Sequence, residues 1–128
     1  MQRLLLVDAS YVVRRVGVCL FKELGFSFSE ASNVQEAKEF CKKSLPNYII
    51  VDAAIEDSLE FISYIRTDLS QKNIIIYYML VEVDLEKMQK AAGAGVTDFL
   101  LKPFNRKILS FIFRNFSNSH ELPYLADK

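Results

Sequence analysis

Five short apolar runs alternate along the chain with longer segments in which apolar residues recur at the helical period. Four of them cover residues 3–7, 48–51, 74–80 and 98–101, and in the fifth, residues 26–30, phenylalanine alternates with polar residues, as in a half-buried strand. Short apolar runs are typical of buried strands, and a period of 3.6 residues indicates amphipathic helices. The repeated strand–helix units therefore predict an α/β protein. Its five-stranded parallel sheet is doubly wound, with right-handed crossovers and five helices spread over both faces.

The predicted helices follow from their apolar faces and from the residues that start or stop them. The first helix is expected to begin at Ser10, to stop before Gly25, and to bury a face formed by Val12, Val13, Val16, Cys19 and Leu20. A capping residue followed three positions later by Glu or Gln is typical of a helix start. The later starts are predicted at Ser32 (with Gln35), Asp57 (with Glu60), Asp84 and about Asn105.

The composition is that of an ordinary globular domain. Of the 128 residues, 51% are hydrophobic, and 16 Lys and Arg balance 16 Asp and Glu. No overall charge favours nucleic acid, no apolar stretch approaches the ~20 residues that span a bilayer, and no signal-peptide pattern opens the chain. We therefore expect a cytoplasmic protein with no nucleic-acid or membrane partner. Residues 1–116 predict one domain, and 117–128 a polar C-terminal tail.

The cysteines and the single histidine suggest no chemistry of their own. Cys19 and Cys41 lack metal-ligand spacing, and each falls on a predicted apolar helix face. Free cysteine commonly behaves as a small buried hydrophobe, which is the expectation for both. His120 lies in the polar tail without a paired nucleophile, so the sequence offers no histidine-based catalysis.

Two acids and a lysine stand where three of the apolar runs stop. Asp8 follows Val7, Asp52 follows Val51, and Lys102 precedes Pro103 after the last run. Because the carboxyl ends of parallel strands share one edge, we expect the three side chains to meet in the crevice where open α/β sheets bind ligands. Two carboxylates beside an ammonium suit a metal ion and a phosphoryl group. The simpler alternative is that the acids cap helices and the lysine only neutralises them.

The last predicted helix, from about Asn105 to Phe116, is apolar around roughly half its circumference, wider than the usual ~100° stripe. Its expected core stripe is Phe104, Ile108, Phe111 and Ile112. The additional apolar residues are Leu109, Phe113 and Phe116. Either the tail folds back over them through Leu122, Tyr124 or Leu125, or they form a partner surface.

The chain resembles the receiver domain of bacterial two-component response regulators, especially single-domain proteins of the chemotaxis type. The matching stretches are Leu5–Ser10 with Arg14-Arg15, Leu24-Gly25-Phe26, Ile49–Asp52, Ile65-Arg66 and Ala94–Phe104. The resemblance covers residues 1–116 and implies a flavodoxin-like sheet of order 2-1-3-4-5.

The resemblance also implies roles for the residues at the strand ends. Asp52 matches the phospho-acceptor, and Lys102 matches the lysine that contacts the phosphoryl group. Asp8, Asp52 and the Ala54 backbone carbonyl match the Mg²⁺ ligands. Leu80 and Phe99 match the two switch positions.

Two matched positions depart from the family pattern. Ala9 replaces the second acid, and Leu80, followed by Val81, replaces a hydroxyl residue. Losing the acid removes an attraction on the order of 4 kcal/mol at ~4 Å and an effective dielectric near 20. Losing the hydroxyl removes roughly 1.5–3 kcal/mol of bonding to a charged phosphoryl oxygen. The loop after Asp52 is also about two residues shorter, and Glu56 is a candidate to replace the missing acid.

The resemblance therefore favours a stand-alone receiver module in phosphorelay signalling that acts through protein contacts. Its expected partners are a histidine kinase or phosphotransfer protein and a downstream target, with a homodimer through the helix 4–strand 5–helix 5 face. Mg²⁺ binding and Asp52 phosphorylation are expected to be weak, as in a pseudo-receiver, and the protein is no enzyme beyond self-catalysed phosphotransfer. The alternative is a working receiver phosphorylated at Asp52.

Two further interpretations concern other parts of the surface. Arg14 and Arg15 are expected to form a solvated helix face, the alternative being a kinase-docking face, which in this family uses the first helix. A flavin or nucleotide carrier is disfavoured because no loop has the glycine-rich phosphate cradle.

Overall fold

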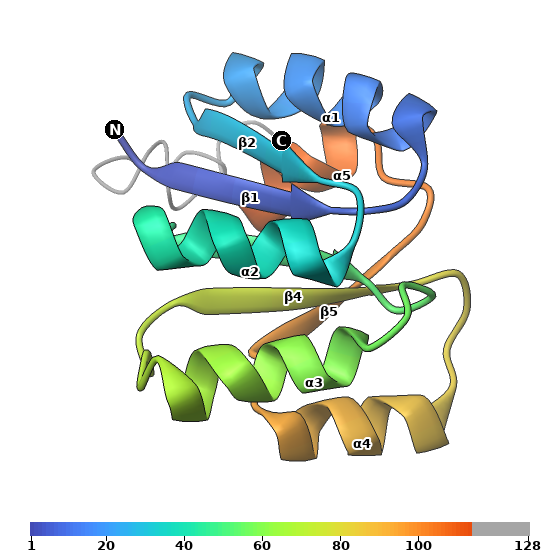
Figure 1. Cartoon of the computed structure of the whole chain (residues 1–128). Coiled ribbons are helices and arrows are strands. Elements are labelled where there is room, and N and C mark those ends of the chain that lie inside the picture. Colours follow the sequence, from blue (N-terminus) through green and yellow to red (C-terminus); the bar gives the residue numbers. More distant parts are fainter. Residues whose placement is uncertain (114–128) are drawn as a thin grey trace.

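A computed structural model of the chain describes residues 1–113 and shows five parallel strands in the order β2-β1-β3-β4-β5 (Figure 1). The strands are β1 Arg3–Val7, β2 Ser27–Ala31, β3 Tyr48–Asp52, β4 Ile75–Leu80 and β5 Asp98–Leu101. The predicted doubly wound sheet and its order are confirmed. All carboxyl ends lie at one edge, at the right of Figure 1.

Helices cover both faces of the sheet. They are α1 Tyr11–Glu23, α2 Val34–Lys43, α3 Ser58–Ser63, α4 Leu85–Ala94 and α5 Arg106–Ile112. A π-helical turn, η1 (Tyr64–Asp68), continues α3. The helices α2, α3 and α4 pack on the face that carries Leu5 and Val7, while α1 and α5 pack on the face that carries Leu4 and Leu6. Alternate residues of β1 thus serve two cores, as period-two alternation requires.

The predicted inner face of α1 is only partly correct, since Val13 and Leu20 pack against the core but Val12, Val16 and Cys19 do not. The buried residues are Gly17 and Phe21, while Val12 and Val16 are 68% and 43% exposed. Gly17 faces β1 closely, since an added Cβ would lie 2.8 Å from Leu6 Cδ2. The aromatic ring of Phe21 then fills the core, which turns Val12 and Val16 outward.

The two cysteines differ in environment. Cys19 is exposed, so its prediction as a core residue is wrong. Cys41 is buried as expected, and its burial raises the pKa of its thiol to about 11.

Two predicted helix caps are also corrected. Asn33, not Ser32, caps α2 by accepting a hydrogen bond from the Glu36 N–H, and Glu36 reaches back to the Ser32 N–H. Asp57 precedes α3 in the left-handed region, with φ 66°, and its side chain makes no capping bond. Asp84 caps α4 as predicted.

The structure corrects part of the predicted faces of α5. Phe104 and Ile112 pack on the core as predicted, but the other assignments are reversed. Leu109 and Phe113, assigned to a partner surface, are 0% and 3% exposed, whereas Ile108 and Phe111, assigned to the core, are 39% and 67% exposed. The reason is an aromatic cluster in which the Phe113 ring contacts the rings of Phe21, Phe26, Tyr48 and Tyr77. The third residue of the predicted surface, Phe116, and the predicted tail lie outside the described residues.

Candidate functional site

The three polar residues predicted to converge at the sheet edge do so. Lys102 Nζ lies 3.0 Å from Asp8 Oδ2 and 3.2 Å from Asp52 Oδ2, so one ammonium joins two carboxylates from neighbouring strands. Asp8 is 1% exposed and Asp52 8% exposed. The trio is therefore a nearly buried cluster with one negative charge in excess.

The ammonium is held in its charged form by the two acids. Burial lowers the pKa of Lys102, but its contacts with Asp8 and Asp52 raise it by more, so that this pKa lies above its ordinary value. In the part of the chain that the structure describes, the buried Asp8 Oδ2 has no other polar partner than this ammonium. Asp8 Oδ2 therefore points into the pocket, toward the Lys102 ammonium.

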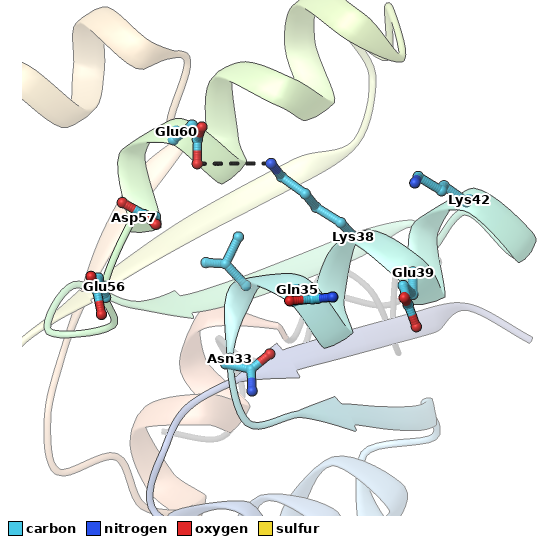
Figure 2. Close-up of a pocket in the computed structure, with 9 residues that line it drawn as sticks. Asn33, Gln35, Lys38, Glu39, Lys42, Glu56, Asp57 and Glu60 are labelled. Carbon is cyan, nitrogen blue, oxygen red and sulfur yellow. Dashed lines mark ion pairs between the residues drawn. The ribbon is translucent and has the colours of Figure 1, made fainter.

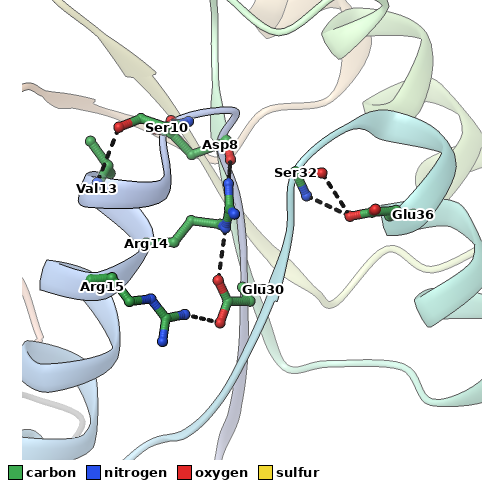
Figure 3. A network of polar contacts seen from close by, with 8 residues as sticks. All are labelled: Asp8, Ser10, Val13, Arg14, Arg15, Glu30, Ser32 and Glu36. Carbon is green, nitrogen blue, oxygen red and sulfur yellow. Dashed lines mark hydrogen bonds and ion pairs between the residues drawn. The ribbon is translucent and has the colours of Figure 1, made fainter.

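A polar network behind the pocket fixes Asp8 (Figure 3). The Ser10 N–H donates to Asp8 Oδ1 at 2.8 Å, and the Ser10 hydroxyl caps α1 by accepting from the Val13 N–H at 3.2 Å. Arg14 Nη1 donates to the Asp8 carbonyl oxygen at 2.8 Å, while its Nε donates to Glu30 at 2.7 Å. Backbone and side chain of Asp8 are therefore both immobilised.

Arg14 is consequently not the solvated residue that the sequence predicted. Its side chain is 14% exposed, whereas that of Arg15 is 40% exposed and meets Glu30 from the outside. Hydrogen bonds from Arg15 and Arg14 hold the pKa of Glu30 below its usual value. The sequence did not predict that Arg14 and Arg15 of α1 pair with Glu30 of β2, because the position of β2 relative to α1 was unknown.

The loop after Asp52 is tied down by hydrogen bonds. The Ala54 N–H donates to Asp52 Oδ1 at 3.3 Å, and the Ala53 N–H donates to the Met79 carbonyl at 2.9 Å. At the end of the loop, the Ser58 hydroxyl lies 2.8 Å from the Tyr78 hydroxyl. Sequence reasoning missed this last contact, because Tyr78 reads as one more apolar residue of a central strand.

Of the two residues that match switch positions, Leu80 borders the pocket and Phe99 packs on Tyr78. Leu80 ends β4, is 4% exposed, and accepts the Lys102 N–H at 2.8 Å through its carbonyl. Phe99 is half-buried on β5, with its ring centroid 6.5 Å from that of Tyr78. A small cavity of about 70 Å³ borders Asp52, Ala54 and Leu80. An apolar side chain therefore closes the wall of the pocket at residue 80.

Glu56 does not replace the acid that Ala9 lacks. It lines a different hollow between α2 and α3, of about 480 Å³, together with Asp57, Glu60 and Lys38 (Figure 2). Residues 1–113 contain no cluster of three or more His, Cys, Asp or Glu side chains that could hold a metal ion. The carboxylates that contact the Lys102 ammonium are those of Asp8 and Asp52. Glu82 and Asp84, from the segment after β4, line the small cavity beside Asp52.

The sequence model of the response regulator receiver domain matches residues 4–113. The chain belongs to this family. Receiver domains are signalling modules of two-component systems, and they generally bind Mg²⁺ at an acidic pocket. The acids and the lysine of this receiver occupy the carboxyl edge of its sheet.

Relatives and solved structures agree with that assignment. The chain is 27% identical over 110 residues to the chemotaxis protein CheY-3 of Vibrio cholerae, covering 84% of this chain and 85% of that protein. It is 24% identical to the sporulation initiation phosphotransferase F of Bacillus subtilis, covering 81% and 84%. The structure of CheY4 of Vibrio cholerae superposes with a TM-score of 0.81 at 27% identity, covering 89% and 98%.

The similarity extends beyond chemotaxis proteins at the level of the fold. A response regulator structure from Chloroflexus aurantiacus gives a TM-score of 0.81 at 24% identity, covering 91% of this receiver and 97% of that chain. Among the residues that the structure describes, no helix is long and apolar enough to cross a membrane.

Proposed function

We propose that this receiver signals through protein contacts and that Asp52 is a phospho-acceptor of weakened activity. The observation that carries the proposal is the Lys102 ammonium, placed 3.0 and 3.2 Å from the carboxylates of Asp8 and Asp52. It keeps the acceptor beside a positive charge that can also bind the oxygens of an incoming phosphoryl group. No other group of ionisable side chains lies so deep in the described part of the molecule.

Two residues weaken the reaction. Leu80 is buried at the pocket wall, where it cannot donate a hydrogen bond to a phosphoryl oxygen. Such a bond to a charged group contributes roughly 1.5–3 kcal/mol, which corresponds to about 10- to 150-fold in rate if it is made in the transition state. Ala9 has no carboxylate to offer a cation.

The donor set supports a weak Mg²⁺ site. Asp8, Asp52 and the Ala54 carbonyl would hold the ion, since Mg²⁺ is bound through one or two carboxylates with water and phosphate oxygens. The buried, singly partnered Asp8 Oδ2 suits a cation. The Lys102 ammonium contacts the same two carboxylates and competes with the metal for them. When bound, Mg²⁺ would neutralise charge on the phosphoryl group.

A working receiver, phosphorylated at Asp52 by a histidine kinase or phosphotransfer protein, is the second candidate. It is favoured by the intact geometry of Asp8, Asp52 and Lys102, which the two departures leave in place.

Labelling with acetyl phosphate and Mg²⁺, read by intact mass, separates the two candidates. The proposal expects slow, substoichiometric labelling that is lost in Asp52→Asn and accelerated at least tenfold in Leu80→Thr. Rapid stoichiometric labelling of the wild type, unaffected by Leu80→Thr, would establish the working receiver instead.

The proposed target or homodimer surface is the α4–β5–α5 face, but it cannot use Leu109 and Phe113, which are buried. Leu101 and Ile108 are 47% and 39% exposed there. We expect Leu101→Glu to abolish self-association in sedimentation experiments, with the fold unchanged in circular dichroism. A wild type that stays monomeric at high concentration would exclude the homodimer.

A further inference from the structure

We propose that Tyr78 and Ser58 are positioning residues that lock the Asp52 loop against Phe99. Their hydroxyls lie 2.8 Å apart, and the two residues are 4% and 6% exposed. Buried hydroxyl groups keep a partner because leaving one unsatisfied is costly. This inference rests on the proposed role of the Asp52 pocket and identifies what holds that pocket in shape.

On one side, Tyr78 and Ser58 are connected to the Asp52 loop. The Ser58 hydroxyl also lies 3.4 Å from the carbonyl oxygen of Ala53, the residue that follows Asp52. The adjoining Ala54 supplies the N–H that binds Asp52 Oδ1 and the carbonyl that would face a cation. Tyr78 therefore fixes, through Ser58, the short loop that carries the ligands of the site.

On the other side, Tyr78 contacts Phe99, which matches the switch position on β5. The Tyr78 ring meets the Phe99 ring edge-to-face, with centroids 6.5 Å apart and an interplanar angle of 72°. A single buried side chain thus contacts both the Asp52 loop and Phe99, in a chain whose residue 80 has no hydroxyl. The contact is direct, so no longer pathway between the two has to be assumed.

The test compares Tyr78→Phe with Tyr77→Phe, which removes the hydroxyl of the neighbouring tyrosine on the opposite sheet face. In Tyr78→Phe, amide exchange at Ala54 and Ile55 should rise about five- to tenfold, as expected for the loss of one hydrogen bond. The NMR resonances of the Phe99 ring should also shift. Ser58→Ala should reproduce both changes, and the double variant should add nothing.

Two outcomes would overturn the lock. One is a Tyr78→Phe variant with the loop exchange and Phe99 resonances of Tyr77→Phe. The other is additive effects of Tyr78→Phe and Ser58→Ala. A parallel titration of the wild type with Mg²⁺ alone keeps the proposed function separate. No response to Mg²⁺ would count against the cation site, while the exchange rates still decide the lock.

Discussion

At the scale of single residues, Lys102 determines how two buried acids coexist. Asp8 and Asp52 each lie about 3 Å from its ammonium, at 3.0 and 3.2 Å. Removing one partner of a buried ion pair leaves an uncompensated charge and costs about 3–5 kcal/mol. The lysine is therefore as much a structural residue as a candidate ligand of a phosphoryl group.

Replacing Lys102 with Met should lower the free energy of unfolding by about 3 kcal/mol at neutral pH. Urea unfolding measures the loss, and Lys107→Met, at an exposed position of α5, is the control. The loss should shrink in the Asp52→Asn background. Mg²⁺ should raise the melting temperature of Lys102→Met more than that of the wild type, because a bound cation would replace the ammonium. Equal stability of the two lysine variants would contradict this account.

Glu30 gives the pocket a pH-dependent support. Its folded-state pKa lies below the ordinary value of 4.5, chiefly because Arg15 and Arg14 donate hydrogen bonds to it. A lowered pKa stabilises the fold fully above the unfolded-state pKa, and this contribution disappears as the pH falls through the folded-state pKa.

Glu30→Gln should therefore be less stable than the wild type at pH 7, and the difference should narrow as the pH falls below 4.5. Thermal unfolding from pH 7 to pH 3 provides the measurement. Glu39→Gln, at an exposed position of α2, should show no such difference. A stability difference between Glu30→Gln and the wild type that grows toward low pH would contradict a lowered pKa of Glu30.

At the scale of elements, periodicity located the helices but not always the face that they bury. In α1 and α5 the apolar residues outnumber the places available in the core, so several faces satisfy the pattern equally well. The choice is made by aromatic packing. The ring centroids of Phe21 and Phe113 are 5.8 Å apart, and those of Phe113 and Tyr77 are 5.5 Å apart. Because Phe113 occupies the core in this way, Ile108 faces outward.

Phe113→Ala should cost about 3–5 kcal/mol of unfolding free energy, because it empties the centre of this aromatic cluster. Ile108→Ala should cost far less, because that side chain is already 39% exposed. Chemical denaturation of both variants provides the measurement. The opposite order would restore the face predicted from the sequence.

At the scale of the whole molecule, the sequence predicted where the site lies because the sheet is parallel. Two acids and a lysine at strand ends must meet when all carboxyl ends share one edge, and they do. The hydrogen bonds that hold these three residues and their loops in place could not be predicted. Arg14 with Glu30 and Ser58 with Tyr78 are contacts between elements whose register and rotation no local pattern specifies.

NMR titration with beryllofluoride and Mg²⁺ shows whether this receiver, with its fold intact, responds only weakly at its pocket. We expect weak binding that perturbs residues around Asp52 and leaves the amides of Leu80 and Phe99 near their free positions. Asp52→Asn should abolish even that response. Saturation at one equivalent, with clear shifts across residues 80–104, would contradict the account.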